Sequence, residues 1–374
     1  MSLKIAVVSN TSFNIVNFRL GLMRALKKAG HDVVAIAPED DYSQTILDND
    51  FRFIPLHKMT RSGTNPLRDL FLIAELRKVY GENNIDIALQ YTIKPNIYGT
   101  LATVFSHTQA ICTVTGLGYV FLNKNLSAHI AKVLYKISFF FAKKIIFQND
   151  DDKDLFIEKN LVSASKVLVV AGSGIDTAQF NIHNYSSSNN SYTTFVMIAR
   201  MLIDKGVYEY IEAAKTIKIH YPNTKFMYVG DIDTSYPSSV AIQDYTSWKE
   251  DAIVEFLGHQ KDVRPYIAIS DCVVLPSYRE GLPRVIIEGM AMSKACIVTD
   301  VPGCRQTIDE NISGYFCKVK DADSLAAVME KYIVLSKEKR EEMSHQARRK
   351  AEQVFDITAI CNMYLNLINS LKIK

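Results

Sequence analysis

Short apolar runs and stretches with helical spacing of apolar residues alternate along the chain. Residues 4–9 and 32–37 have the composition of buried strands, and between them the apolar residues of 17–30 recur at helical spacing until Gly30. The order strand, helix, strand predicts a parallel sheet with right-handed crossovers. The other runs that predict strands in this half of the chain are 51–56, 85–90, 110–114, 145–147 and 167–170.

A polar segment, residues 186–191 (SSSNNS), interrupts this alternation and predicts exposed chain. After it, the apolar run 194–199 starts a second series of strands and helices. A chain of 374 residues is also too long for one ordinary core. We therefore predict an α/β protein with two doubly wound domains, at residues 1–185 and 192–355, followed by a terminal helix at 356–374.

The residues most suited to chemistry lie between 270 and 308. An apolar run at 272–275 predicts a buried strand, and Pro283 suits the first turn of a following helix that is apolar over a broad surface. Glu280 lies in the loop between them, where an acid also simply favours the start of a helix. Glu288 follows on the predicted helix, with seven residues between the two acids. An acid on an apolar helix is costly to bury without a partner. The second acid therefore points to a ligand.

The segment 280–288 (EGLPRVIIE), with Pro276 and Ser277 before it and 300–303 (DVPG) after it, resembles the E-x7-E signature of family-four retaining nucleotide-sugar glycosyltransferases. The similarity covers nearly the whole chain and is strongest from 200 to 302. It implies the GT-B fold, in which two Rossmann-like domains face a central cleft and the last helix crosses back to the first domain.

The resemblance also implies roles for residues of the second half. Arg200 and Lys205 follow a predicted strand and precede a predicted helix, where cations can neutralise a diphosphate. In the family, the matching cations hold the leaving nucleoside diphosphate, and the acids matching Glu280 and Glu288 meet the donor sugar and the ribose hydroxyls. The implied catalytic residues are Glu280, Arg200 and Lys205. The implied donor-binding residues are Glu288, Gly281, Leu282, Pro283, Asn14 and Gly230.

Candidates for the acceptor site lie in the first half. The basic segment 57–66 resembles an N-P segment of bacterial enzymes that extend undecaprenyl-diphosphate-linked sugars, and it also fits a solvated loop. Lys94 follows a predicted strand, where it could hold phosphate or be an ordinary loop lysine. Thr115 stands where many relatives have a histidine that meets the donor sugar, which indicates a different sugar or acceptor. The acceptor-binding candidates are Lys94, Arg61, Arg68, Thr115 and Gly116.

Residues 126–144 form a helical stretch in which lysines stand among aromatic and aliphatic residues. Lysine beside aromatic residues can dock a helix on an anionic bilayer. We interpret the stretch as a core helix whose lysines reach solvent, with bilayer docking as the alternative. No window of the sequence reaches the roughly 18 to 20 continuous apolar residues of a membrane span.

Composition narrows the function further. With 48% hydrophobic and 22% charged residues the chain is globular, and its net charge of +3 is too small to argue for nucleic acid. The loop after the first strand lacks the GxGxxG of dinucleotide enzymes, which counts against an oxidoreductase. Six cysteines without metal-ligand spacing indicate buried thiols in a reducing cytoplasm. Nothing resembles a dedicated Asp-x-Asp metal site, so we expect no cofactor and no metal.

These observations predict a cytoplasmic retaining glycosyltransferase. The resemblance implies transfer of a hexose or an N-acetylhexosamine from a UDP-sugar to an undecaprenyl-diphosphate-linked saccharide, for capsule, O-antigen or a related bacterial glycan. Peripheral attachment to the inner face of the plasma membrane stays open. The alternatives are transfer to a soluble acceptor, a UDP-sugar 2-epimerase of the same fold, and a nucleotide-sugar binding protein without turnover.

Overall fold

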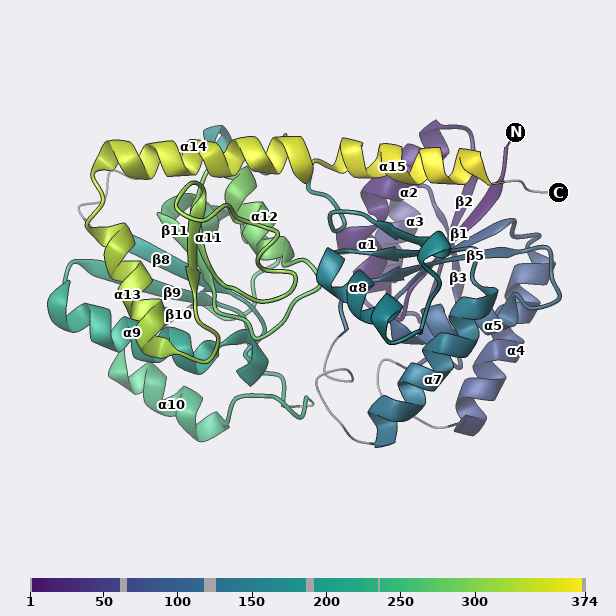
Figure 1. Ribbon diagram of the computed structural model, residues 1–374, viewed down its shortest axis with the longest axis horizontal. Helices are drawn as coiled ribbons and strands as arrows, with labels where there is room; N and C mark the ends of the chain where they lie inside the picture. The colour runs from purple at the N-terminus through teal and green to yellow at the C-terminus, as the bar shows by residue number, and fades with distance from the viewer. Residues whose placement is uncertain (1, 61–65, 118–125, 186–191, 235, 372–374) are drawn as a thin grey trace. The chain divides into compact units, whose positions relative to one another are not determined.

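The computed structural model of the chain describes residues 2–60, 66–117, 126–185, 192–234 and 236–371. The chain separates into two compact units (Figure 1): unit 1 comprises Met1–Gly174 together with Ile357–Lys374, and unit 2 comprises Ile175–Asp356. Each unit is a parallel sheet with helices on both faces, which confirms the predicted α/β class.

Unit 1 is built on a seven-stranded parallel sheet with the strand order β3-β2-β1-β4-β5-β6-β7. Its inner strands are continuous apolar runs because helices cover both faces, and Ile5 to Val8 of β1 are fully buried. The chain moves from one side of β1 to the other between β3 and β4. The strands are β1 (Lys4–Val8), β2 (Asp32–Ala37), β3 (Arg52–Pro55), β4 (Ile87–Tyr91), β5 (Gln109–Val114), β6 (Lys144–Phe147) and β7 (Val167–Val169).

Two layers of helices cover this sheet. One hydrophobic cluster joins α1, α2, α3 and α15 to one face, and two further clusters join α4, α5 and α7 to the other face. The helices of unit 1 are α1 (Ser12–Phe18), α2 (Leu20–Lys28), α3 (Ser43–Asp48), α4 (Pro66–Glu82), the π-helix η1 (Pro95–Gly99), α5 (Thr100–Ala102), α7 (Leu126–Phe141), α8 (Asp150–Glu158), the 3-10 helix η2 (Ala164–Lys166) and α15 (Ile357–Ser370).

The helix α15 adds residues from the far end of the chain to the core of unit 1. Ile360, Cys361 and Tyr364 are buried in the same cluster as β1 and α2, and the Tyr364 hydroxyl lies 3.2 Å from that of Thr113. The sequence analysis expected a terminal helix at 356–374, and the structure places its described part in the N-terminal unit.

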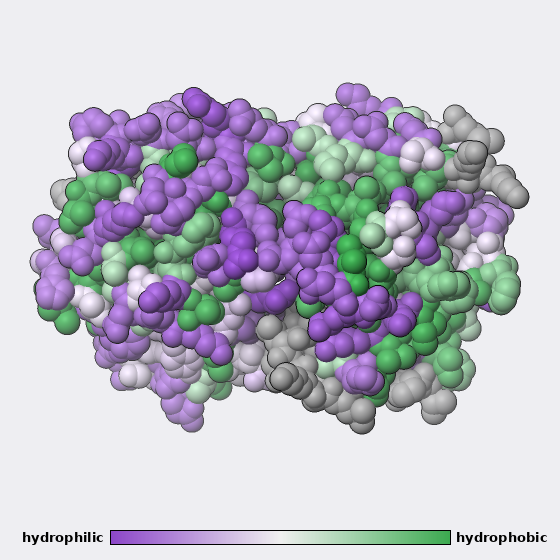
Figure 2. Space-filling model, viewed as in Figure 1, coloured by the Kyte–Doolittle hydropathy of each residue, from purple (hydrophilic) through white to green (hydrophobic). Residues whose placement is uncertain are grey.

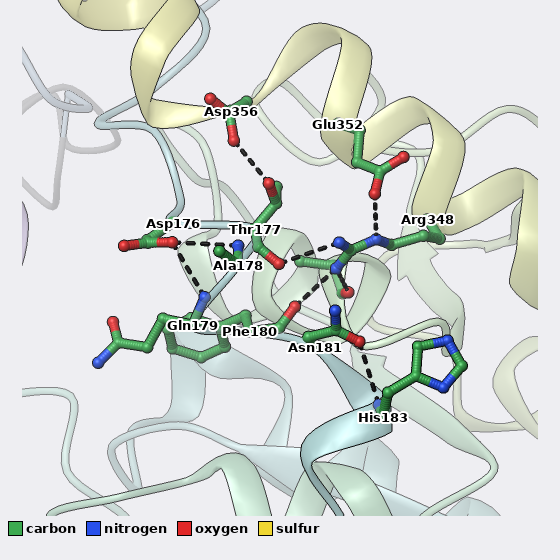
Figure 3. Close-up of polar contacts among 11 residues, drawn as sticks. Asp176, Thr177, Ala178, Gln179, Phe180, Asn181, His183, Arg348, Glu352 and Asp356 are labelled. Carbon is green, nitrogen blue, oxygen red and sulfur yellow. Dashed lines mark hydrogen bonds and ion pairs between the residues drawn. The ribbon is translucent and has the colours of Figure 1, made fainter.

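Residues 175–185 belong to unit 2, and not to the first domain as predicted from the sequence. The reason lies in backbone contacts that Figure 3 shows. Arg348 of α14 (Lys337–Val354) donates hydrogen bonds to the carbonyls of Thr177 and Phe180, at 3.0 and 2.7 Å, and to that of Ala291. Asp356 accepts a hydrogen bond of 2.6 Å from the Thr177 hydroxyl. These contacts fix the segment after Gly174 to the last helices of unit 2.

Unit 2 is built on a six-stranded parallel sheet with the order β10-β9-β8-β11-β12-β13. Its strands are β8 (Thr193–Ile198), β9 (Thr224–Val229), β10 (Val254–Phe256), β11 (Cys272–Leu275), β12 (Ala295–Thr299) and β13 (Gly314–Cys317). Its helices are η3 (Ile182–Asn184), η4 (Ile203–Lys205), α9 (Val207–His220), α10 (Ile242–Asp251), α11 (Arg264–Ile269), α12 (Arg284–Ala291), α13 (Ala322–Ile333) and α14 (Lys337–Val354). The strand order reverses between β8 and β11, and open α/β sheets bind ligands at the carboxyl ends of strands at such a point.

Candidate active site

Two of the three residues assigned to catalysis, Lys205 and Glu280, meet at the carboxyl ends of β8 and β11, and the third, Arg200, follows β8 at the same edge of the sheet. β8 and β11 are parallel neighbours, so the loops that follow them leave the sheet at the same edge. Arg200 lies two residues after β8, Lys205 ends the short helix η4, and Glu280 lies five residues after β11. The topology of unit 2 therefore gathers groups that are about eighty residues apart in the sequence.

Lys205 and Glu280 are in direct contact. The Nζ atom of Lys205 lies 2.5 Å from Oε1 of Glu280, and the two side chains are only 20% and 14% exposed. The hydroxyl of Ser277 donates a hydrogen bond of 2.7 Å to the same carboxylate oxygen. The carboxylate thus holds the ammonium group in a defined orientation at the edge of the sheet.

Two glycines allow the loops around this pair to approach one another. Gly206 has a φ of +78°, and a Cβ atom there would lie 2.2 Å from the carbonyl oxygen of Pro276. Gly303, which ends the DVPG segment, has a φ of +84°, and its Cβ would lie 2.3 Å from the carbonyl oxygen of Glu280. Only glycine fits such close backbone contacts at positive φ. The glycines of both segments are therefore needed to place Lys205 and Glu280.

The helix after this loop starts one residue later than expected. Pro283 is the N-cap of α12 with extended backbone, and Arg284 is the first helical residue. Gly281 and Leu282 lie directly before it, so the three residues expected to present backbone to the donor sugar form the entry to the helix. Their contact with a donor stays a prediction.

Glu288 has a partner that the sequence analysis missed. Nε of Arg284 donates a hydrogen bond of 2.8 Å to Oε1 of Glu288, and the acid is 12% exposed. Burial raises the pKa of Glu288, and the nearby positive charge of Arg284 opposes this shift. The two residues are four positions apart in one helix, a spacing at which side chains meet. The signal for the pair was therefore present in the sequence.

Arg200 is exposed and stacks on an aromatic ring. Its guanidinium carbon lies 4.3 Å from the centroid of the Tyr236 ring, within the range of a cation–π contact. Tyr236 is a second residue of this region that the sequence analysis did not single out. The stacking holds the guanidinium of Arg200 near the ends of β8 and β9, and its role on a diphosphate stays a prediction.

Gly230 has a structural explanation. It has a φ of +147°, and a Cβ atom there would lie 1.9 Å from the carbonyl oxygen of Ala199. Its amide donates a hydrogen bond of 2.9 Å to the carbonyl of Gly258. The residue therefore lets the loops that follow β8, β9 and β10 pack together. Its direct contact with a donor stays a prediction.

Asn14 lies in α1, the helix that follows β1. The hydroxyl of Thr11 accepts a hydrogen bond of 3.2 Å from the amide of Asn14, so α1 begins at Ser12. The side-chain amide of Asn14 donates to Oδ1 of Asn10 at 2.9 Å. Its side chain thus points back toward the end of β1, and its contact with a donor stays a prediction.

Lys94 belongs to a polar cluster in unit 1. Its Nζ atom lies 3.1 Å from Oδ1 of Asp69 and 3.0 Å from the hydroxyl of Thr60, and the side chains of Lys94 and Asp69 are 15% and 7% exposed. The hydroxyl of Tyr98 donates to the other oxygen of Asp69 at 2.8 Å. Asp69 was not singled out from the sequence. The ion pair gives Lys94 a structural role beside the predicted contact with the acceptor.

The other acceptor candidates are spread over unit 1. Arg61 lies outside the described residues. Arg68 is exposed on the first turn of α4. Thr115 and Gly116 follow β5 directly, and Gly116 has a φ of +127°, where glycine is favoured. These positions are compatible with the prediction and do not test it.

Two other kinds of site, a metal site and a membrane span, are absent from the described part of the chain. Across the described residues, no group of three or more His, Cys, Asp or Glu side chains could hold a metal ion. No helix in the described part of the chain is both long enough and apolar enough to cross a membrane. All six cysteines are buried, as the sequence predicted.

Two family models match the chain and together cover well over half of it. The model of glycosyl transferases group 1 matches residues 178–350, and the glycosyl transferase 4-like model matches residues 4–149. The chain is a glycosyltransferase. The sequence signature, the two family models and the fold agree, and the predicted enzyme class is confirmed.

Curated relatives of this glycosyltransferase include proteins of similar length. The N,N'-diacetylbacillosaminyl-diphospho-undecaprenol alpha-1,3-N-acetylgalactosaminyltransferase of Campylobacter jejuni is 29% identical over 98% of each chain. The UDP-Gal:alpha-D-GlcNAc-diphosphoundecaprenol alpha-1,3-galactosyltransferase of Escherichia coli is 25% identical over 78% of each chain. The capsular polysaccharide biosynthesis glycosyltransferase CapM of Staphylococcus aureus is 25% identical, over 81% of this chain and 83% of CapM.

Solved structures support the fold of this glycosyltransferase. HepE from Anabaena in complex with UDP and glucose has a TM-score of 0.80 at 19% identity, over 99% of this chain and all of HepE. A glycosyltransferase from Rickettsia africae has a TM-score of 0.80 at 21% identity, over 98% of this chain and 97% of the other. The predicted GT-B fold is confirmed.

Proposed function

We propose that this glycosyltransferase transfers a hexose or an N-acetylhexosamine from a UDP-sugar to an undecaprenyl-diphosphate-linked saccharide, with retention, in the synthesis of a bacterial surface glycan. Two relatives that match most of this chain are named for a diphosphoundecaprenol-linked acceptor, and the name of one of them also states UDP-Gal. Both names state an alpha linkage, the product of retention when the UDP-sugar donor is itself alpha-linked. The enzyme then works in the cytoplasm at the inner face of the plasma membrane, where its acceptor lies.

The observation that carries this proposal is the contact between Lys205 and Glu280 at the carboxyl edge of the unit 2 sheet. During transfer the bond from C1 of the sugar to the diphosphate breaks, and the departing group gains negative charge. Lys205 and Arg200 supply positive charge to that group. The amides at the entry of α12 add donors close by.

The carboxylates have complementary tasks in this scheme. Glu280 accepts hydrogen bonds from sugar hydroxyls while it orients Lys205. Glu288, held by Arg284, accepts hydrogen bonds from the ribose hydroxyls. The acceptor hydroxyl attacks C1 on the face from which UDP leaves, and its proton passes to the departing diphosphate. These reaction steps account for every bond and proton, and they require no nucleophile from the protein.

A transfer assay tests the proposal. Purified enzyme is incubated with UDP- and GDP-sugars, each with and without a polyprenyl-diphosphate saccharide, and products are identified by mass spectrometry and NMR. The expected result is one alpha-linked product that requires a UDP-sugar and the lipid-linked acceptor. Epimerisation of the UDP-sugar without an acceptor would overturn the proposal in favour of the epimerase alternative. Transfer to small soluble molecules alone would overturn the assignment of the acceptor.

A further inference from the structure

The helix α7 of unit 1 has two apolar faces. The inner face packs on the sheet, where Tyr135 and Phe139 are almost fully buried and both contact the ring of Phe156. This face satisfies the usual reason for an apolar helix surface, namely burial against a core. The interpretation of residues 126–144 as a core helix therefore accounts for this half of the helix alone.

The outer face of α7 carries a second apolar row that the protein leaves uncovered. Its members follow one another at intervals of one to four residues, and we call them the outer stripe: Ile130, Val133, Ile137, Phe140 and Phe141, which are 50, 45, 46, 74 and 46% exposed. Single exposed apolar residues are common, but a continuous row on one helix marks a contact surface. In Figure 2, hydrophobic side chains gather over the part of unit 1 where Figure 1 draws α7.

Further exposed apolar side chains lie on the same helical layer. Phe105, three residues after α5, is 95% exposed, and Leu70 and Phe71 of α4 are 62 and 63% exposed. The helix α5 contacts both α4 and α7, and all three helices cover the same face of the unit 1 sheet. The outer stripe thus lies on a helical layer that carries further exposed apolar side chains.

The segment of the sequence that contains α7 carries positive charge only. Residues 87–149 contain six lysines and neither Asp, Glu nor Arg, and the next acid is Asp150 at the start of α8. Lys136 and Lys143 are exposed beside the stripe. A third cation, Lys166, donates hydrogen bonds to the carbonyls of Phe139 and Phe140 at the end of α7. Lysines around exposed aliphatic and aromatic side chains match a surface that is apolar inside and negative outside.

We propose that the outer stripe of α7 docks on an anionic lipid bilayer, with the helix parallel to the membrane plane. At 16 residues, the helix is about 24 Å long, shorter than the bilayer core of about 30 Å, so it lies on the membrane and does not span it. The inserted side chains supply apolar contact, and the lysines meet the anionic head groups. The inference rests on the proposed function, because a lipid-linked acceptor requires an enzyme at the membrane surface.

Vesicle co-sedimentation of the full chain tests the docking. The protein is expected to sediment with phosphatidylcholine vesicles that contain phosphatidylglycerol, weakly with phosphatidylcholine alone, and less at high salt. The double variant Ile137→Ser/Phe140→Ser should weaken binding about tenfold or more, because both side chains lose their apolar contact with lipid. The matched control is Ile219→Ser/Ile242→Ser in unit 2, whose side chains are 76 and 57% exposed, and it should bind as the wild type does.

The charge of the surface is tested separately. The variant Lys136→Gln/Lys143→Gln should weaken binding to anionic vesicles by about fivefold per lysine and leave the weak binding to neutral vesicles unchanged. The control Lys337→Gln/Lys339→Gln changes two exposed lysines of unit 2 and should have no effect. Equal losses in both charge variants would overturn the assignment to α7.

A soluble readout separates this inference from the proposed function. All these variants should transfer sugar to a short-chain, water-soluble polyprenyl-diphosphate saccharide at the wild-type rate, and their melting temperatures should be unchanged. If the wild-type enzyme transfers sugar but does not bind anionic vesicles, the docking is overturned and the proposed function stands. Binding to anionic vesicles without any sugar transfer would overturn the proposed function and leave the docking standing. Self-association that the stripe variants abolish, with no vesicle binding, would reassign the surface to a protein interface.

Discussion

The ion pair between Lys205 and Glu280 makes a quantitative prediction about non-additive loss of activity. If Glu280 orients the ammonium group that stabilises the departing diphosphate, the two residues act as one unit. Replacing Lys205 by Met removes one donor to the developing charge, which typically costs about 2.7–4 kcal/mol, or 10² to 10³ in kcat. The packing of the lysine stem is retained in this variant.

The matching change, Glu280→Gln, keeps the size of the side chain but leaves Lys205 without its carboxylate. The ammonium group is still present in this variant but is no longer held in place, and a misplacement of about 1 Å can cost about 10²-fold, so we expect a loss of about 10²-fold in kcat/KM. Ser277 still donates to the side-chain oxygen at position 280, so the loop is expected to keep its shape.

The assay is a double-mutant cycle on kcat/KM for sugar transfer, with thermal melts to show that each variant is folded. The double variant should lose no more than about tenfold beyond the worse single variant. A double loss equal to the product of the two single losses would refute the coupling. The control is Lys215→Met, because Lys215 pairs with Glu212 at 3.1 Å on the surface, with exposures of 32 and 55%. It should change activity by less than about twofold.

Four further predictions follow from the same site. Arg200→Ala should lower kcat/KM by more than about tenfold, roughly 1.4 kcal/mol, and a smaller loss would contradict the leaving-group role. The control Tyr236→Phe should have a kcat/KM close to that of the wild type. Gly206→Ala should destabilise the protein by about 1 kcal/mol or more in denaturant unfolding, while Gly81→Ala, whose added Cβ meets nothing within 4 Å, should be neutral or stabilising. Burial raises the pKa of Glu288 in the folded state, so its contribution to stability is present below the ordinary glutamate pKa and is lost as the pH rises through the raised value. Glu288→Gln should therefore raise the melting temperature, relative to wild type, more at pH 7 than at pH 4, and an equal difference at both pH values would contradict this. Transfer should persist in EDTA after removal of divalent ions, and its loss with recovery on adding Mg²⁺ or Mn²⁺ would contradict the expected metal independence.

The regular part of the fold was readable because parallel strands covered on both faces are continuous apolar runs. Runs such as 4–9 and 272–275 therefore predicted β1 and β11 almost to the residue. The strand β13 was missed because it has four residues and begins with glycine. A Cβ at Gly314 would lie 2.0 Å from the carbonyl oxygen of Cys296, so the pairing itself requires a residue of low strand propensity.

Features that depend on distant contacts were not readable. The predicted helix 17–30 is two helices that meet at Arg19, which is buried with its guanidinium 3.9 Å from the ring centroid of Tyr91. Likewise, the end of unit 1 at Gly174 depends on Arg348, far away in the sequence. No local pattern signals either contact.

Some residues of the candidate site could be found from local sequence, and other contacts there depend on residues far apart in the chain. The spacing of Glu280 and Glu288 located the site, and Arg284 could have been found from its position one helical turn before Glu288. The pairing of Lys205 with Glu280 spans 75 residues, and it is set by the adjacency of β8 and β11. The resemblance placed both residues in one site, while the contact itself required the structure.

The position of α15 has a consequence for the order in which the protein is made. The ribosome synthesises all of residues 175–356 after Gly174 and before it reaches Ile360 and Tyr364, which fill the core of unit 1. The half that emerges first is thus the last to close, and until then its strands keep an apolar gap open to solvent. A truncated product that lacks the last eighteen residues would retain an intact unit 2 beside an incomplete, chaperone-binding partner.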